Sequence, residues 1–138
     1  EHGIHYQERV VKEGNFSYLY GADIAQTILH LDPRPTALFA SNDYMAAAVL
    51  KAATQMNLKV PDDISIAGFD NAPIARHIWP GLTTIAQPVE DMTRLAVSHL
   101  IEQINKVDSQ ESEDDSGPLQ ITLEAELICR ESTAAPKK

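Results

Sequence analysis

Two apolar segments that each end abruptly at polar residues place the strongest limit on how this chain can fold. The first, residues 36–40, is followed by Ser41 and Asn42, and the second, residues 64–69, is followed by Asp70. An alanine-rich segment of helical composition, residues 44–56, separates them. A strand, a crossover helix and a second strand form a βαβ unit, in which the strands are parallel and their carboxyl ends share one edge. The sequence therefore predicts polar side chains at the edge where ligands bind in open α/β sheets.

The rest of the chain continues this alternation of helical and strand patterns. We expect helices where apolar residues recur every three or four positions, and strands where apolar and polar residues alternate. Helices are expected over residues 17–31 and 88–106, a short element over 72–78, and strands over 8–12, 82–86 and 119–128. The predicted fold class is α/β, with a mostly parallel sheet and helices on both faces.

Charge and cysteine content exclude several classes of protein. The 138 residues include 11 basic and 20 acidic side chains, a formal charge of -9, which argues against binding of a nucleic-acid backbone by this chain. The single cysteine, Cys129, excludes an internal disulfide, and its apolar neighbours predict a buried, inert thiol. A single thiol fits a reducing compartment, and the expected location is cytoplasmic. No apolar run approaches the ~20 residues of a membrane span, so no membrane partner is expected.

Enzyme motifs are missing from the sequence. The histidines have no HExxH spacing, and there is neither a GxSxG motif nor a glycine-rich phosphate loop. Asp43 and Asp70 form the one carboxylate pair that glycoside hydrolysis would need, but no other feature supports that reaction. We therefore expect no catalytic residue, no metal site and no cofactor.

The polar residues at the two strand ends have structural interpretations beside the functional one. Asn42 and Asp43 stand where a helix N-cap is expected, because Asn and Asp are favoured there. Asp70 is either a ligand-binding carboxylate or a turn residue that bonds to the backbone of Asn71 and Ala72. The residues alone leave both interpretations open.

Four motifs, in this order, carry a family resemblance. They are Pro-Thr-Ala-Leu-Phe-Ala-Ser-Asn-Asp at 35–43, Val-Pro-Asp-Asp-Ile-Ser-Ile-Ala-Gly-Phe-Asp-Asn at 60–71, Pro-Gly-Leu-Thr-Thr-Ile-Ala-Gln-Pro at 80–88 and Leu-Ile-Cys-Arg-Glu-Ser-Thr at 127–133. Together they resemble the effector-binding domain of LacI/GalR-family transcription regulators, from about residue 13 to 133. The resemblance implies an incomplete, periplasmic-binding-protein-like domain without its DNA-binding headpiece. Residues 1–86 then form most of the second lobe, 87–130 return to the first lobe, and 131–138 are a tail.

The resemblance also implies roles for individual residues. A small sugar- or nucleoside-like effector binds between the lobes, and the family places an asparagine and an aspartate against it. The implied ligand-binding residues are Asp70, Asn42, Phe16, Tyr44 and Gln87, and the implied interface of a homodimer contains Ala47, Leu50, Ala75, Arg76 and Ile78. Operator DNA is then bound only through a headpiece outside this chain. Two alternatives are a periplasmic sugar-binding protein of a transport system and a dimerisation fragment that binds no small molecule.

Overall fold

The computed structural model describes residues 7–108 and 120–136, which form two compact units. The first unit is Glu1–Ala86 together with Leu127–Lys138, and the second is Gln87–Glu126. The closing residues 127–138 group with the first unit. The division into lobes that the family resemblance implies stays a prediction.

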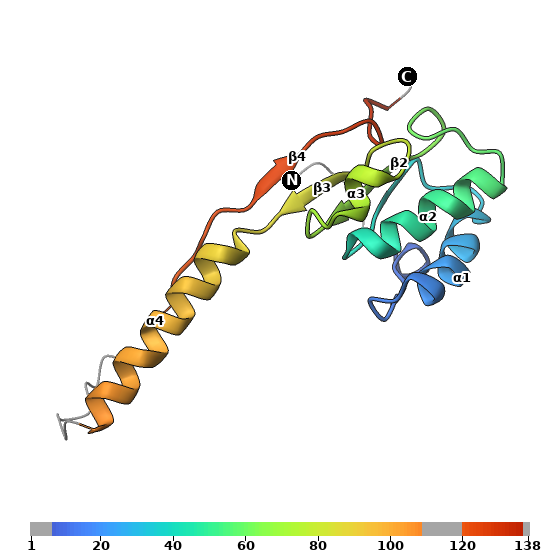
Figure 1. The fold of residues 1–138 in the computed structure, drawn as a ribbon. Coiled ribbons are helices and arrows are strands. Elements are labelled where there is room, and N and C mark those ends of the chain that lie inside the picture. Colours follow the sequence, from blue (N-terminus) through green and yellow to red (C-terminus); the bar gives the residue numbers. More distant parts are fainter. Residues whose placement is uncertain (1–6, 109–119, 137–138) are drawn as a thin grey trace. The chain divides into compact units, whose positions relative to one another are not determined.

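A four-stranded sheet forms the centre of the first unit (Figure 1). Its strands lie in the order β1 (Ala37–Phe39), β2 (Ser65–Phe69), β3 (Thr83–Ala86) and β4 (Glu126–Ile128). β1 pairs with β2 and β2 with β3, both in parallel, with Leu38 opposite Ile66 and Gly68 opposite Thr84. The crossover between β1 and β2 is the helix α2 (Asp43–Gln55), so the predicted βαβ unit and the α/β fold class are confirmed.

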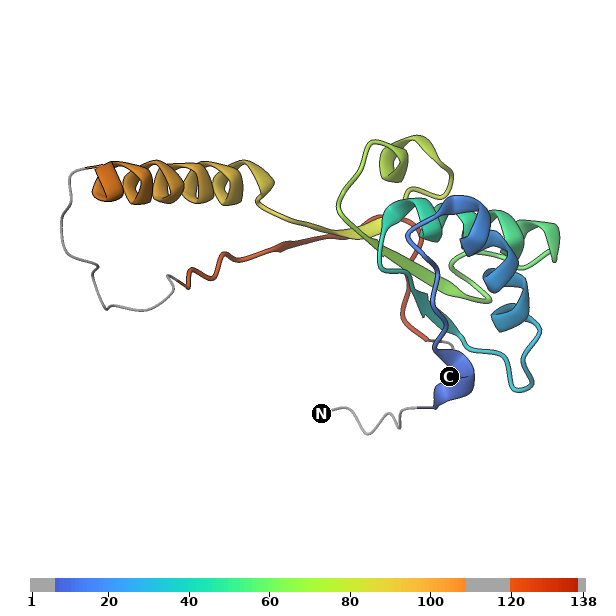
Figure 2. The ribbon, with the colours of Figure 1, turned by 90° about the horizontal axis from the view of Figure 1, so that it is seen from below.

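Small side chains let the helices pack closely on one face of the sheet. α1 (Tyr18–Leu29) packs on α2, which packs on β2, and Figure 2 shows α1 and α2 side by side. Ala46 and Ala53 of α2 are completely buried against a core that includes Ile66. The short helix α3 (Ile74–His77) adds Ala75 to the same core and occupies the short element expected over 72–78.

The opposite face of the sheet is more open. Phe39 and Phe69 project there, with ring centroids 6.5 Å apart and ring planes at 88°, an edge-to-face contact. Phe39 remains 62% exposed on this face.

Two expected strands differ in the structure. Residues 8–12 are not a strand: Glu8–Val10 form a short 3₁₀ helix, because β1 pairs only with β2 and this segment has no neighbouring strand in the described sheet. Of the strand expected over 119–128, only Glu126–Ile128 form a strand within the described residues, and residue 119 lies outside them.

The second unit contains one long helix, α4 (Val89–Asp108), where the sequence predicted one. Its apolar side chains, including Met92, Leu100 and Ile104, are exposed. None of the helices in the described ranges has the length and apolar character needed to cross a bilayer.

Candidate functional site

Asn42 connects the start of α2 to the loop that carries Phe16. Its Oδ1 accepts a hydrogen bond from the Met45 N–H at 2.8 Å, which makes it the N-cap of α2. Its Nδ2 donates to the carbonyl oxygen of Phe16 at 3.3 Å, and the side chain is only 8% exposed. The cap interpretation therefore describes its position here, and its contact with an effector stays a prediction.

Two aromatic residues near this helix start are exposed. Phe16 is 72% exposed and follows Asn15, and both have left-handed backbones with φ of 50° and 54°. Tyr44, in the first turn of α2, is also exposed. An exposed ring is suited to stack on the apolar face of a sugar or a base, and these two ligand roles remain predictions.

Asp43 is completely buried beneath the carboxyl edge of the sheet. Its Oδ1 accepts a hydrogen bond from the Thr84 hydroxyl at 2.6 Å, and its Oδ2 accepts one from the Ala72 N–H at 2.7 Å. Burial raises the pKa of Asp43, the nearby carboxylate of Asp70 raises it further, and the two hydrogen bonds oppose the rise. Gly68 leaves room for this side chain, because a Cβ at residue 68 would overlap Oδ1.

Asp70 lies at the carboxyl end of β2 with its side chain exposed. Its φ is 103° and that of Asn71 is 50°, so two successive non-glycine residues adopt left-handed backbones. The Asp70 N–H donates to the Ile85 carbonyl oxygen at 2.9 Å. We considered a turn in which the Ala72 N–H donates to Asp70. In the structure, this N–H donates to Asp43 Oδ2.

Arg130 is a residue of this site that the sequence did not identify. Its Nη1 donates to the Leu82 carbonyl oxygen at 2.6 Å, and its Nη2 donates to Asn71 Oδ1 at 2.7 Å. Arg130 lies in the closing motif, but nothing in the sequence pattern pairs it with a residue 59 positions away. It joins the closing segment to the turn after β2.

Ser132 explains why the closing residues belong to the first unit. Its hydroxyl donates to the Ile66 carbonyl oxygen at 2.6 Å and accepts from the Thr83 N–H at 2.8 Å. Its backbone oxygen also accepts from the Ile66 N–H at 2.8 Å. The side chain is completely buried, so this segment bridges β2 and β3.

The remaining predicted residues lie elsewhere. Gln87 comes directly after β3 and is the first residue of the second unit. Of the five residues expected at a dimer interface, Ala47, Leu50 and Ala75 are buried within one protomer, Ile78 is half-buried and Arg76 is exposed. Neither set is tested by the structure, and both roles stay predictions.

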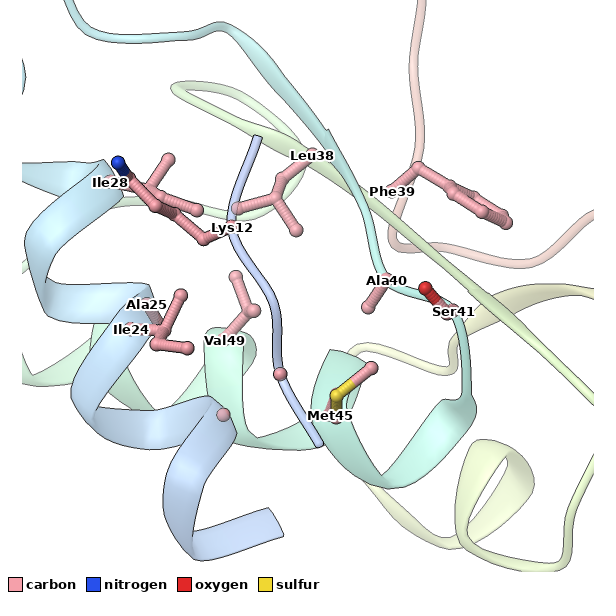
Figure 3. Close-up of a pocket in the computed structure, with 12 residues that line it drawn as sticks. Lys12, Ile24, Ala25, Ile28, Leu38, Phe39, Ala40, Ser41, Met45 and Val49 are labelled. Atoms are coloured by element: carbon pink, nitrogen blue, oxygen red, sulfur yellow. The ribbon is translucent and has the colours of Figure 1, made fainter. Parts of the chain in front are cut away.

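A small apolar pocket of about 70 Å³ opens between α1, β1 and α2 (Figure 3). Ile28, Leu38 and Val49 surround it, Lys12 crosses in front, and the ring of Phe39 points away (Figure 3). Binding sites for small molecules usually have about 300–1,000 Å³ and several polar groups, so this pocket is too small and too apolar for a sugar. Two larger pockets, of about 640 and 630 Å³, border the outer edge of β1 and the amino ends of the strands and contain none of the predicted ligand residues.

Two further observations concern possible metal ligands and the single cysteine. Residues 7–108 and 120–136 contain no group of three or more His, Cys, Asp or Glu side chains that could hold a metal ion. Cys129 is exposed, so the prediction of a buried thiol was wrong. It lies between half-buried Ile128 and Arg130, on the side of the chain that faces solvent.

Comparison with known proteins identifies the family. Residues 1–133 match the periplasmic binding protein-like domain. The chain belongs to this family. It is 38% identical over 133 residues to the HTH-type transcriptional repressor CytR of Escherichia coli (strain K12), an alignment that covers 96% of this chain and 37% of CytR. The chain thus spans little more than a third of that relative.

Solved structures of the family give the same result. A complex of the transcriptional regulator CelR with cellobiose has a TM-score of 0.81 and 31% identity, over 94% of this chain and 38% of that one. A LacI-family regulator from Enterococcus faecium with bound ribose has a TM-score of 0.72 and 29% identity, over 88% of this chain and 42% of that one. The resemblance to LacI/GalR-family regulators and the periplasmic-binding-protein-like fold are confirmed.

Proposed function

We propose that this chain is the effector-sensing and dimerisation part of a cytoplasmic, LacI/GalR-type transcriptional regulator. Residues 1–86 form most of the second lobe, 87–130 return to the first lobe, and the effector binds between the lobes. An effector that binds one arrangement of the lobes more tightly than another shifts the population toward it, which changes how attached headpieces bind operator DNA. The charge of -9 leaves DNA contacts to a headpiece outside this chain.

The observation that carries this proposal is the exposed carboxylate of Asp70 at the carboxyl edge of a parallel sheet. A carboxylate accepts hydrogen bonds only, so it is suited to a ligand with several hydroxyl or amino groups. Phe16, whose ring is exposed, lies near the start of α2, because the Asn42 Nδ2 donates a hydrogen bond to the Phe16 backbone carbonyl oxygen. Relatives solved with cellobiose and with ribose support a ligand of this class.

The regulator is favoured over a transport protein of the same architecture. Relatives such as CytR are named as HTH-type transcriptional repressors, which is the feature that distinguishes a regulator from a periplasmic sugar-binding protein. The proposal therefore includes no enzymatic step, no cofactor and no membrane partner.

Substitution of Asp70 tests the proposal. We expect Asp70→Ala to weaken effector binding about tenfold or more, because a hydrogen bond to a charged group contributes about 1.5–3 kcal/mol. The measurement is calorimetric titration with cellobiose and ribose, made on the longest form of the protein that its gene encodes. Asp62→Ala, in the exposed loop before β2, is the matched control and should leave affinity unchanged. Equal affinities of the two variants in folded protein would refute the role of Asp70.

A homodimer completes the proposal. Charged substitutions at buried Ala47 or Leu50 would damage the protomer itself, so exposed Arg76 is the sharper probe. Arg76→Glu should raise the dissociation constant of a two-fold dimer measured by sedimentation equilibrium. A monomeric parent protein at high concentration would contradict this part of the proposal.

A further inference from the structure

The turn after β2 has a backbone conformation that needs support from its surroundings. Asp70 and Asn71 both have positive φ values, 103° and 50°, and neither is glycine. Such conformations are unfavourable for residues with a Cβ and persist where neighbouring groups hold them. The groups that hold this turn therefore decide where the Asp70 carboxylate is placed.

Buried side chains from two other elements hold the turn. The Asn71 N–H donates to the Thr84 hydroxyl oxygen at 3.3 Å, and the Ala72 N–H donates to Asp43 Oδ2 at 2.7 Å. The Thr84 hydroxyl in turn donates to Asp43 Oδ1 at 2.6 Å. Asp43 and Thr84 are both completely buried, so water does not readily replace these bonds.

We propose that Asp43 and Thr84 are positioning residues for the effector site. They fix the Asp70–Ala72 turn in its left-handed conformation, so that the Asp70 carboxylate is already oriented when the effector arrives. Neither side chain reaches the surface, so they act on the effector only through the turn. This inference rests on the proposed function, because it assigns to Asp70 the contact with the effector.

Arg130 supports the same turn from the other side. Its guanidinium binds Asn71 Oδ1 and the Leu82 carbonyl oxygen, which ties the turn to the closing segment. The two buried residues and Arg130 together engage the turn through both its backbone and its one amide side chain. A preorganised turn binds its ligand without the entropic cost of ordering, which is the physical benefit of the arrangement.

Thr84→Val is the first test, because it removes the hydroxyl and keeps the shape of the side chain. Hydrogen exchange in the 138-residue chain should become at least about tenfold faster at the Asn71 and Ala72 amides, which report local opening. Thr54→Val is the control: it removes a hydroxyl that bonds to the Leu50 carbonyl oxygen within α2, away from the turn. Unchanged exchange at the two turn amides would overturn the proposal that Thr84 holds the turn.

Affinity separates positioning from a merely structural role. In the longest form of the protein, Thr84→Val should weaken binding of ribose or cellobiose by about tenfold, whereas Thr54→Val should not. Weaker binding by Asp70→Ala together with unchanged binding by Thr84→Val would overturn this inference alone. Unchanged binding by Asp70→Ala would overturn the ligand role of Asp70 in the proposed function, and the exchange experiment would then decide whether Thr84 holds the turn.

The pH dependence of effector affinity distinguishes a positioning role of the Asp43 carboxylate from a role in packing alone. The charged groups that act on Asp43 are Asp70, at the end of β2, and Arg130, after β4, and burial raises the pKa of Asp43 above the ordinary aspartate range. As the pH falls through that raised pKa, Asp43 becomes neutral, its hydrogen bonds to the turn weaken, and affinity should fall. Asp43→Asn is neutral at every pH and should lose this inflection. An unaltered profile would contradict a positioning role for Asp43.

Discussion

Gly68→Ala tests whether the buried carboxylate of Asp43 organises this edge of the sheet. Gly68 lies within β2 with an ordinary strand backbone, so the cost of a methyl group there is steric. The new Cβ would overlap Asp43 Oδ1 and would lie 3.0 Å from Leu82 Cδ2 and 3.2 Å from Ala46 Cβ. The carboxylate must therefore leave its place, and its two hydrogen bonds are lost with it.

The expected cost follows from those contacts. Each hydrogen bond to a charged group contributes about 1.5–3 kcal/mol, and overpacking a core costs about 1–3 kcal/mol. Better hydration of the displaced Asp43 offsets part of this loss, because burial already disfavours its charged form. We expect the free energy of unfolding to fall by about 3–5 kcal/mol, a large part of the 5–15 kcal/mol typical of a domain.

A double-mutant cycle shows whether Asp43 is the cause. Gly68→Ala and Asp43→Ala each remove the same two hydrogen bonds, so the double variant should be within about 1 kcal/mol of Asp43→Ala alone. The assay is urea unfolding of the 138-residue chain, with the free energy extrapolated to zero denaturant. Gly81→Ala is the matched control, because its new methyl would meet the far end of the exposed Glu131 side chain, which can move. Additive costs of the two substitutions would refute the reasoning.

Two further outcomes follow from the same edge of the sheet. Asn42→Ala should lower the free energy of unfolding by about 1–2 kcal/mol through loss of the N-cap of α2, measured by urea unfolding, and no change would contradict the cap. The raised pKa of Asp43 means that the folded chain binds its proton more readily than the unfolded chain. The free energy of unfolding that protonated Asp43 contributes should therefore fall as the pH rises from about 3.9, the ordinary aspartate value, through the raised pKa. Urea unfolding at a series of pH values measures this dependence, and Asp43→Asn should abolish it.

Local patterns in the sequence were sufficient to predict the βαβ unit. The apolar run ending before Asn42, the alanine-rich helix and the run ending before Asp70 are each recognisable within about 14 residues, because propensity and periodicity are local properties. The structure places β1 and β2 within one residue of the expected bounds and confirms their parallel pairing. It also leaves Asp70 exposed at the edge where its position after a strand suggested it would be.

Features that depend on distant partners were not predictable in the same way. Residues 8–12 have the composition of a strand, but a strand forms only beside another strand. Within the described sheet, β1 is hydrogen-bonded to β2 and not to residues 8–12. The roles of Thr84 and Arg130 were not predictable, because their hydrogen bonds to Asp43 and Asn71 connect positions 41 and 59 residues apart. Only the folded chain brings these groups together.

The two aspartates at this edge differ in role because they differ in exposure. Asp43 is buried, so its charge is tolerated only while Thr84 and Ala72 donate hydrogen bonds to it, and those bonds hold the turn. Asp70 is exposed, so its carboxylate does not carry that burial penalty. An anionic ligand would meet Asp70 on a chain of net charge -9, whereas a neutral polyhydroxy ligand meets acceptors without repulsion. The charge of the chain is thus in keeping with the neutral sugar or nucleoside class that we propose for the effector.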